Sequence, residues 1–501
     1  MGIFANPLTD LLEYEDFSRD FLKGTDPVGM TGCIDSEKVH FMSTFLGEKK
    51  VQLVVTYNEQ RAREIEEDYK LFCSQVYVIP PRDLIFFSAD LQGNAIIAER
   101  MKAFAALYQN EAKVIITTMD ALMSAAVPFE QLMSHVIKLK EGDELDLEKL
   151  KHDLTVMGYE RVGRVEEPGQ FTVHGGIADV YPLTMEVPVR IELWGDEIDT
   201  IRCFEPQSQR SMDQIECVSV FPAAEVIADD TARRRAVGMI QNELESQLAV
   251  FKKVKEPDKA KRLREETNRI LEALGEDVVL EAPDSYISYF YPRTVQLSEY
   301  FDEKNTLVFL DEPMRLKERG DGVQAEFEES MKNRLEQGFL LPGQTALLTP
   351  AKHVLAAFER GQVAALSSLD SRLADFTVVN SYAVNVQNMN TYREGFELLI
   401  KDLTHWKKEK YRVVLLCPSR TRANRIVNQL IEYDLLAYYS EDEDKKINPG
   451  EIMVTYGNLH RGFLYPMLKF AVITESDIFG VKKKKKEKKS HYQGQRISDF
   501  A

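Results

Sequence analysis

The sequence predicts an α/β protein in which a parallel-sheet domain is split by a small β-rich insertion and followed by a further α/β domain. Residues 1–136 alternate strand-like and helix-like segments, residues 170–211 have the turns and period-two pattern of an antiparallel sheet, and helical segments return from about residue 223. A chain of 501 residues is long enough for roughly three to four domains, each with its own core.

The first half of the predicted parallel sheet occupies residues 1–136. Its clearest apolar runs are 51–57, 76–80 and 113–118, and the helix-like segments between and after them are 58–72 and 94–108. Because parallel strands are joined by crossover connections that are usually helical, this alternation is typical of a sheet with helices on its faces.

The β-rich insertion is expected over residues 137–222. A helix-like segment that ends near Gly158 introduces it. A Gly-Asp dipeptide at 195–196 suits a tight hairpin between the β-rich runs 189–194 and 198–204.

The second half of the split domain is expected over residues 223–348. Six apolar side chains there keep helical spacing: Ala236, Val237, Ile240, Leu244, Leu248 and Phe251. The apolar run at 306–313 is a strand that can rejoin the first sheet.

A further α/β domain is predicted over residues 349–480, because strand-like runs such as 376–386 and 411–419 alternate with helix-like segments. Residues 481–501 begin with a run rich in lysine. A block of like charge is typical of a solvated linker, and local contact with phosphate is the alternative.

Composition excludes several classes of protein. The net charge of −18 disfavours binding to nucleic acid over a broad surface. Five cysteines without a CxxC spacing suggest neither a disulfide framework nor a zinc site. No apolar run is long enough for a membrane span and the N-terminus has no secretory pattern, so a cytoplasmic protein is expected.

Period two assigns the faces of the predicted hairpin strand 189–194. Val189, Ile191 and Leu193 fall on the core side, whereas Arg190, Glu192 and Trp194 fall on the solvent side. Trp and Arg are enriched at binding hot spots, so this face predicts a docking surface. The alternative is that Trp194 lies under a neighbouring domain of the same chain.

The segment after the first apolar strand lacks an intact phosphate loop. A P-loop NTPase needs GxxxxGK[ST], whereas this chain reads GMTGCIDSEKVHF at 29–41. Gly29 and Gly32 are retained as turn glycines and Lys38 is present. The second glycine of the motif is replaced by Ser36 or Glu37, depending on the alignment, and Lys38 is followed by Val39.

Acidic residues follow the strand-like run at 306–310. Asp311 and Glu312 are placed like the magnesium-binding acidic motif of the same NTPase class. Without the glycine-lysine loop this pair is expected to be a remnant or a strand-end cap, because both halves of a phosphate site must act together.

The motif GGIADVYPL followed by IELWGDEIDTIRCFEPQSQRS, within residues 175–211, is similar to the second domain of the helicase subunit UvrB and resembles more closely the Mfd family of bacterial transcription-repair coupling factors. The segments VIITTMDALM, NTLVFLDEP and HRGFLYPMLKFAVITESDIFG also resemble Mfd, so the resemblance covers essentially the whole chain. It implies a degenerate P-loop NTPase-like, UvrB-like domain around a UvrA-binding domain at 137–222.

The resemblance to Mfd implies a docking function in nucleotide excision repair. The UvrA-contacting positions of the family fall on His174, Arg190 and Trp194, where the family usually has two arginines and an aromatic residue. The chain would recruit UvrA to a stalled RNA polymerase. The polymerase-binding domain and the ATP- and Mg-dependent DNA translocase of the family do not follow, so the sequence looks like a truncation.

No catalytic residue, metal site or cofactor is expected in this chain, and RNA polymerase and double-stranded DNA are expected to be partners only through the missing C-terminal domains. The competing interpretation is a UvrB-like ATP-dependent helicase subunit, against which the loop at 29–39 argues.

A phosphate pocket at Arg420, Arg422 and Arg425 is the alternative to a solvated helix face. Neither the role of residues 349–480 nor the oligomeric state follows from the sequence.

Overall fold

The computed structural model describes residues 7–48, 51–82, 92–275, 283–370, 376–392, 395–442 and 445–480. The chain divides into two compact units between Asn385 and Val386. The predicted lysine-rich linker at 481–501 lies outside the described residues. No helix in the described ranges is both long enough and apolar enough to cross a bilayer.

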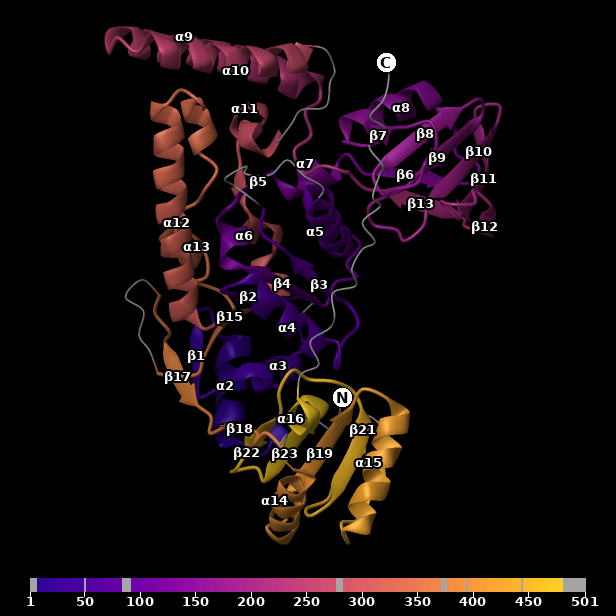
Figure 1. Ribbon diagram of the computed structural model, residues 1–501, viewed down its shortest axis with the longest axis vertical. Helices are drawn as coiled ribbons and strands as arrows, with labels where there is room; N and C mark the ends of the chain where they lie inside the picture. The colour runs from indigo at the N-terminus through magenta and orange to yellow at the C-terminus, as the bar shows by residue number, and fades with distance from the viewer. Residues whose placement is uncertain are drawn as a thin grey trace, which may run out of the picture. The chain divides into compact units, whose positions relative to one another are not determined.

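The larger unit is built on a seven-stranded sheet in which all neighbouring strands are parallel (Figure 1). In spatial order the strands are β17 (Asn380–Ala383), β1 (Val28–Thr31), β16 (Val363–Ser367), β15 (Thr306–Asp311), β2 (Val51–Thr56), β4 (Val114–Thr118) and β3 (Val76–Ile79). Strands β1 to β4 precede the β-rich insertion in the sequence, and β15 to β17 follow it. The return of the strand near residue 306 is therefore confirmed, since β15 pairs directly with β2.

The central strands of this sheet consist mainly of buried β-branched and other apolar residues. All six residues of β2 are buried, and so are all five of β4. Burial on both faces explains why these strands read as continuous apolar runs rather than as alternating ones. The helices and short strands around the sheet are α2 (Leu12–Lys23), α3 (Asp35–Ser43), α4 (Glu59–Tyr69), α5 (Gln92–Tyr108), α6 (Met119–Met123), β5 (Ala125–Ala126), α7 (Phe129–Met133), α11 (Ile287–Phe290), β14 (Val295–Gln296), α12 (Pro313–Glu336) and α13 (Ala351–Ala356).

The insertion contains a six-stranded sheet and one helix. The sheet has the order β12 (Ser211–Gln214), β11 (Glu197–Phe204), β10 (Val189–Trp194), β9 (Ile177–Val180), β8 (Gln170–His174) and β7 (Glu160–Arg161). Helix α8 (Leu147–Val156) contributes Leu150 and Leu154 to a core shared with the inner faces of these strands. As predicted, the helix ends just before Gly158, which has a φ of +91°.

Two strands hold the ends of the insertion together. β6 (Ile137–Lys140) and β13 (Cys217–Val220) form an antiparallel pair in which Ile137 lies opposite Val220. The chain therefore enters and leaves the insertion at nearly the same place.

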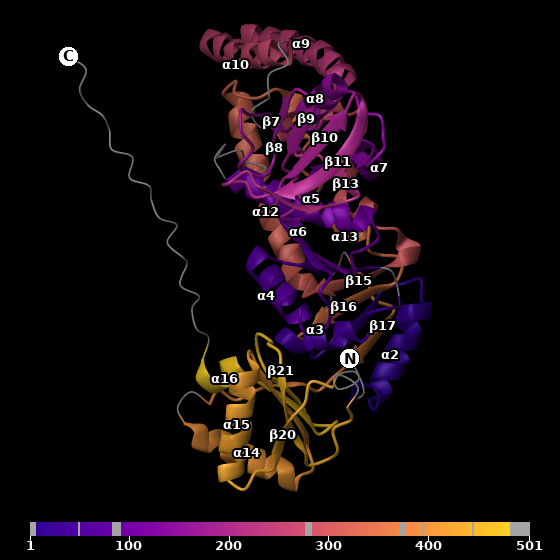
Figure 2. The ribbon, with the colours of Figure 1, turned by 90° about the vertical axis from the view of Figure 1, so that its right-hand side faces the viewer.

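Two long helices follow the insertion, α9 (Asp230–Lys253) and α10 (Pro257–Gly275). They pack side by side as a helical hairpin (Figures 1 and 2). The predicted helical spacing is confirmed, because Ala236, Ile240, Leu244 and Phe251 are buried in the main core.

The smaller unit is a second α/β domain with its own six-stranded sheet. Its sheet has the order β18 (Gln387–Asn388), β22 (Phe463–Tyr465), β23 (Phe470–Thr474), β19 (Arg412–Cys417), β21 (Ile452–Tyr456) and β20 (Ala437–Tyr439). Its helices are α14 (Phe396–Lys408), α15 (Arg420–Glu432) and α16 (Glu475–Phe479).

The boundary of this unit differs from the predicted one at 348/349. Strands β16 and β17 lie at 363–367 and 380–383, and both pair with β1 in the sheet of the larger unit. The prediction placed them with the last domain because sequence order does not reveal which sheet a strand completes. The smaller unit begins at about Val386.

Candidate functional site

The predicted hairpin of the insertion is present at β10 and β11. Trp194 lies opposite Glu197, and Gly195 and Asp196 form the two-residue turn. Gly195 has a φ of +68°, a conformation that glycine adopts at little cost. The dipeptide therefore fixes the position of Trp194 at the end of the strand, directly before the turn.

The two faces of β10 follow the predicted alternation. Val189 and Ile191 are fully buried in the core of the insertion, while Leu193 is only partly buried at its margin. On the opposite face, Trp194 is 84% exposed. No other described segment of the larger unit covers Trp194.

A second apolar side chain lies on the same outer face as Trp194. Ile177 on β9 is opposite Glu192 on β10, two residues before Trp194, and it is 40% exposed. His174 on β8 is opposite Ile177 and is also exposed. Because paired residues in a sheet project to one side, His174, Ile177 and Trp194 form one exposed surface, called here the hairpin face.

Arg190 lies on the outer face of β10, as predicted, but its guanidinium is paired within the sheet. Its Nε and Nη2 atoms donate to the two carboxylate oxygens of Asp179 at 2.8 and 2.7 Å. The guanidinium also lies over the ring of Phe204, 4.7 Å from its centroid. The hydrogen bonds to Asp179 are the main reason why the pKa of Arg190 is raised. Arg190 therefore lies on the same outer side of the sheet as Trp194. Its side chain is half-buried and paired, whereas that of Trp194 is exposed.

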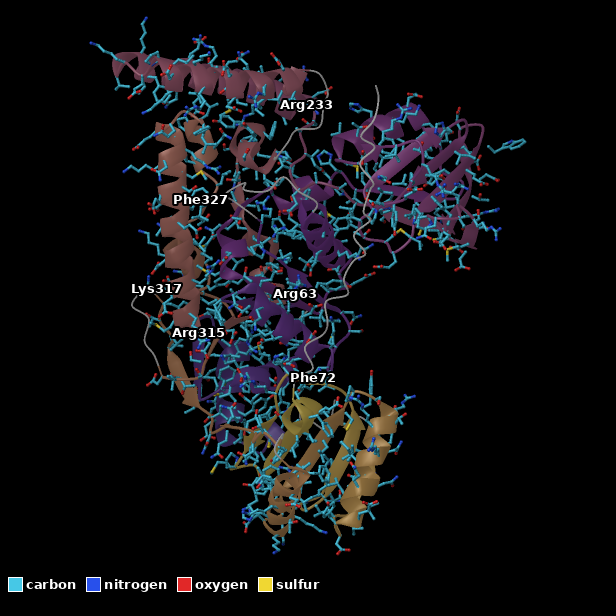
Figure 3. The ribbon with its side chains drawn as sticks, in the orientation of Figure 1. Arg63, Phe72, Arg233, Arg315, Lys317 and Phe327 are labelled. Carbon is cyan, nitrogen blue, oxygen red and sulfur yellow. The ribbon has the colours of Figure 1, made fainter. Side chains whose placement is uncertain are left out.

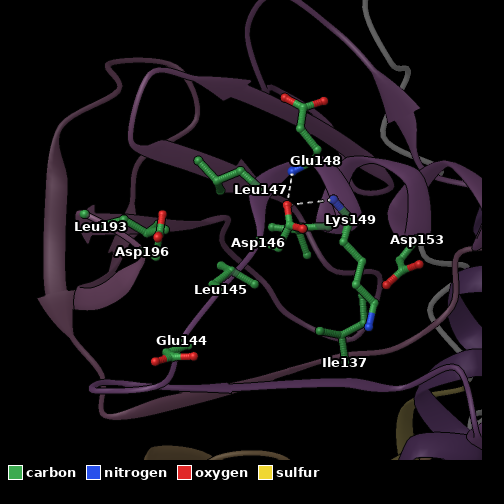
Figure 4. Close-up of a pocket in the computed structure, with 12 residues that line it drawn as sticks. Ile137, Glu144, Leu145, Asp146, Leu147, Glu148, Lys149, Asp153, Leu193 and Asp196 are labelled. Carbon is green, nitrogen blue, oxygen red and sulfur yellow. Dashed lines mark hydrogen bonds between the residues drawn. The ribbon is translucent and has the colours of Figure 1, made fainter.

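A groove of about 780 Å³ lies beside the hairpin turn, on the side of α8 (Figure 4). It is lined by Leu193, Asp196 and the residues that begin α8. Asp146 accepts hydrogen bonds from the backbone N–H groups of Glu148 and Lys149, as the dashed lines show. The acidic rim of the groove is therefore partly the N-terminal cap of α8.

The second candidate site is the region of the degenerate phosphate loop. Gly29 lies inside strand β1, opposite Ala365 and Ser381, so it is not the turn glycine that the motif suggested. Gly32 does form a turn, with a φ of +84°. Helix α3 begins at Asp35, which leaves three residues between strand and helix.

Substitution of the two glycines should separate their roles. We expect Gly32→Ala to lower the free energy of unfolding by about 2 kcal/mol, because φ is positive and a Cβ would lie 2.0 Å from the carbonyl oxygen of Val384. Gly29→Ala is the matched control, since its Cβ would meet only side chains at 3.4 Å. Urea denaturation of both variants measures the difference, and equal stability would contradict the assignment.

Lys38 is bound to the acidic motif of its own chain. Its Nζ lies 2.7 Å from Asp311 Oδ1 and 2.6 Å from Glu312 Oε1, and the side chain is 3% exposed. Thr56 Oγ1 donates to Asp311 Oδ2 at 2.8 Å, and Arg61 Nε lies 3.4 Å from the same oxygen. The lysine of the NTPase motif thus binds both residues of the acidic pair, and Arg61 supplies a second positive charge.

Burial and charge act in opposite directions on this cluster. Burial alone would raise the pKa of Asp311, but Lys38, Arg61 and the hydrogen bonds to the carboxylate lower it to about 2. Burial would lower the pKa of Lys38, and the two carboxylates raise it above its usual value. Asp311 and Lys38 are therefore both charged near neutral pH.

A carboxylate also occupies the N-terminus of α3, where a P-loop binds phosphate. Glu37 is fully buried, and its Oε2 accepts a hydrogen bond from the backbone N–H of Ile34 at 3.1 Å. A helix N-terminus favours an anion, and here the chain itself supplies one. These residues do not fit a bound nucleotide with its metal ion, because Glu37 and Lys38 already have partners within the chain.

The arginines at the start of α15 are engaged as well. Arg420 is paired with Glu441, and Arg422 with Glu475. Two of the three arginines of the predicted phosphate pocket thus have carboxylate partners, which favours the alternative of a solvated, charged helix face.

Several residues of both sites could not be found from the sequence. Asp179 and Ile177 lie on the strand next to β10, and only the register places them beside Arg190 and Glu192. Thr56 and Arg61 reach Asp311 from more than 200 positions away. In β9 only Ile177 is exposed, whereas Ala178, Asp179 and Val180 are buried, so the period of this strand gave no signal for them.

The split parallel sheet with its β-rich insertion is consistent with a UvrB-like module. Two sequence families match directly. Residues 137–225 match the UvrB interaction domain, and residues 405–478 match the D3 domain of MFD. The chain is homologous over nearly its whole length to transcription-repair-coupling factors, the Mfd family.

Three relatives show the extent of this homology. The transcription-repair-coupling factor of Bacillus subtilis strain 168 is 28% identical over 503 residues, which is 99% of this chain and 42% of the relative. The factor of Staphylococcus epidermidis RP62A is 28% identical over 494 residues, covering 98% and 41%. That of Staphylococcus aureus Mu50 is 25% identical over 505 residues, with the same coverage. The chain spans about two fifths of the length of these relatives.

Proposed function

We propose that this chain is a docking module that binds UvrA through the hairpin face of its insertion and thereby brings excision repair to stalled RNA polymerase. The observation that carries the proposal is the 84% exposure of Trp194 directly before a two-residue hairpin turn, within the region that matches the UvrB interaction domain. A large aromatic side chain held in water by a tight turn is a typical binding hot spot.

The side chains of the hairpin face suggest two roles, apolar contact with the partner and positioning of the sheet. Trp194 and Ile177 provide apolar contact area, and His174 provides a polar group beside them. Arg190 is held by Asp179 and Phe204, so we assign it the role of positioning the outer side of the sheet, with at most one nitrogen left for UvrA. This differs from a surface in which Arg190 is the main contact.

We further propose that the NTPase-like domain of this chain is a scaffold without ATPase activity. The support is the pairing of Lys38 with Asp311 and Glu312, together with the position of Glu37 at the start of α3. The same pairing disfavours the alternative of a UvrB-like helicase subunit. In a longer protein of this family, translocation on DNA and contact with RNA polymerase would belong to domains beyond this chain.

Isothermal titration calorimetry with UvrA tests the docking proposal. Trp194→Ala is expected to weaken binding by about 2 kcal/mol, or roughly 30-fold, because it removes the exposed anchor. The melting temperature should not change, since the side chain is 84% exposed. Met212→Ala is a matched control, as it removes a 52% exposed apolar side chain from edge strand β12 of the same sheet.

Thermal melting separates the role of Arg190 from that of Trp194. Arg190→Ala should lower the melting temperature of the insertion, because it leaves Asp179, which is 9% exposed, without its partner. Absence of UvrA binding by the folded wild-type chain would overturn the proposal. Equal binding by wild type and Trp194→Ala would place the contact elsewhere on the chain.

A further inference from the structure

The tip of the α9–α10 hairpin concentrates positive charge on an otherwise acidic chain. Residues 252–264 contain seven lysines and arginines against two acidic residues, whereas the whole chain has a net charge of −18. Figure 3 labels Arg233 in the first turn of α9, at the opposite end of the hairpin from this tip. That end has its own cations, Arg233, Arg234 and Arg235, but two acidic residues, Asp229 and Asp230, lie beside them, so the larger excess of positive charge is at the tip.

A groove of about 660 Å³ lies at this tip, between the end of α9 and the start of α10. Its apolar part is formed by Leu248 and Phe251 from α9 and by Pro257 and Ala260 from α10. These residues recur at helical spacing, so each helix contributes one stripe. The volume is in the range of sites that bind small molecules or single side chains. We call it the tip groove.

Cations surround the apolar part of the tip groove. Lys252, Lys255, Lys261 and Arg264 line it, against one carboxylate, that of Glu256. Lys255 has a φ of +58° in the turn between the helices. Both elements that form the groove therefore contribute positive charge to its rim.

Several of these cations are unpaired. Within the described part of the chain, no carboxylate forms an ion pair with Lys252, Lys255 or Arg264, all of which are exposed. Glu256 is instead 3.5 Å from Lys259. The groove thus combines an apolar interior with free positive charge at its edge.

We propose that the tip groove binds a short acidic protein segment that carries an apolar side chain. The apolar side chain would fill the space between Leu248 and Ala260, and carboxylates beside it would pair with Lys255 and Arg264. A segment of this kind matches both the shape and the charge of the groove. The proposal does not depend on UvrA binding, because the tip groove and the hairpin face lie on different elements.

Nucleic acid fits the tip groove less well. A phosphodiester backbone has no apolar side chain to place between the two helices. An extended polyanion would also reach past the tip, where the excess of negative charge on the chain repels it. A short segment would meet only the local positive charge.

Fluorescence anisotropy with a labelled synthetic peptide tests this proposal. The probe is a peptide of about 14 residues, rich in Asp and Glu, with Leu and Phe one helical turn apart. We expect saturable binding to the full chain. Lys255→Glu combined with Arg264→Glu should raise the dissociation constant at least about tenfold, because it replaces two attractive charges by repulsive ones. Circular dichroism verifies that the variant is folded.

Matched controls make the result specific. Lys352→Glu with Lys401→Glu changes the net charge equally at two exposed lysines outside the tip and should change the dissociation constant less than about twofold. Trp194→Ala should bind the peptide like the wild type, which separates this site from the docking proposal. A peptide without Leu and Phe should bind much more weakly.

Three outcomes would overturn the inference. These are no saturable binding by the wild-type chain, equal binding by the charge-reversed variant, or equal binding of the peptide that lacks Leu and Phe. Tighter binding of a DNA duplex of about 20 base pairs, lost in the same charge-reversed variant, would assign the tip to nucleic acid instead.

Discussion

Lys38→Ala is expected to lower the free energy of unfolding by about 3–5 kcal/mol. The lysine is 3% exposed and bonded to Asp311 and Glu312, so its removal leaves Asp311, which is 2% exposed, beside a second carboxylate with only Arg61 to compensate. Urea denaturation measures the loss. Lys352→Ala, at an exposed lysine on α13, should change stability by less than about 0.5 kcal/mol.

The pH dependence of this effect follows from the pKa of Asp311. The folded-state pKa is lowered to about 2, below the unfolded value, so its stabilising contribution is present above about pH 4 and is lost as the pH falls toward 2. The difference between wild type and Lys38→Ala should therefore shrink over this range. A difference that does not change with pH would show that the lysine acts by packing alone.

Glu225→Ala is the second substitution expected to be severe, with a loss of about 3 kcal/mol. Glu225 is 5% exposed and pairs with Arg100 of α5, which is 1% exposed, while Arg82 approaches to 3.8 Å. Burial would raise the pKa of Glu225, but the two arginines lower it, so the group is charged. Its removal leaves the buried Arg100 without a carboxylate partner, while Arg82 keeps Asp284 at 2.9 Å.

The chain offers a matched control for Glu225. Glu186 of the insertion pairs with Lys102, also on α5, but it is 88% exposed. Glu186→Ala should cost at most about 1 kcal/mol, because solvent screens the pair. Chemical denaturation of both variants measures the two losses. Equal losses would contradict the view that burial makes the ion pair of Glu225 with Arg100 more important for stability than the exposed pair.

Local sequence signals predicted much of this fold. The Gly-Asp dipeptide at 195–196 and the alternation along 189–194 were sufficient for the hairpin and its faces, because a turn and its adjacent strands depend on neighbouring residues. The helix with Ala236, Ile240 and Leu244 on one side followed in the same way from its period. The return of the strand at 306 to the first sheet followed from its apolar run and from the resemblance.

Contacts between distant segments could not be predicted from such signals. The sequence placed Arg190 on the outer face correctly, but the register with β9 decides that Asp179 binds it. Lys38 and Asp311 are 273 positions apart, so their pairing depends on the order of strands in the sheet. The same strand order places β16 and β17 in the seven-stranded sheet. This explains why the domain boundary lies at about residue 385.

The pairing of β6 with β13 has a consequence for how such a chain can evolve. Since Ile137 and Val220 are neighbours across one strand pair, the insertion starts and finishes at a single point of the chain that carries it. The parallel-sheet domain therefore needs to hold the two ends of the insertion only as far apart as the ends of a short loop. An insertion of this kind can be exchanged, lost or acquired as one piece, while the host domain keeps its own strand order.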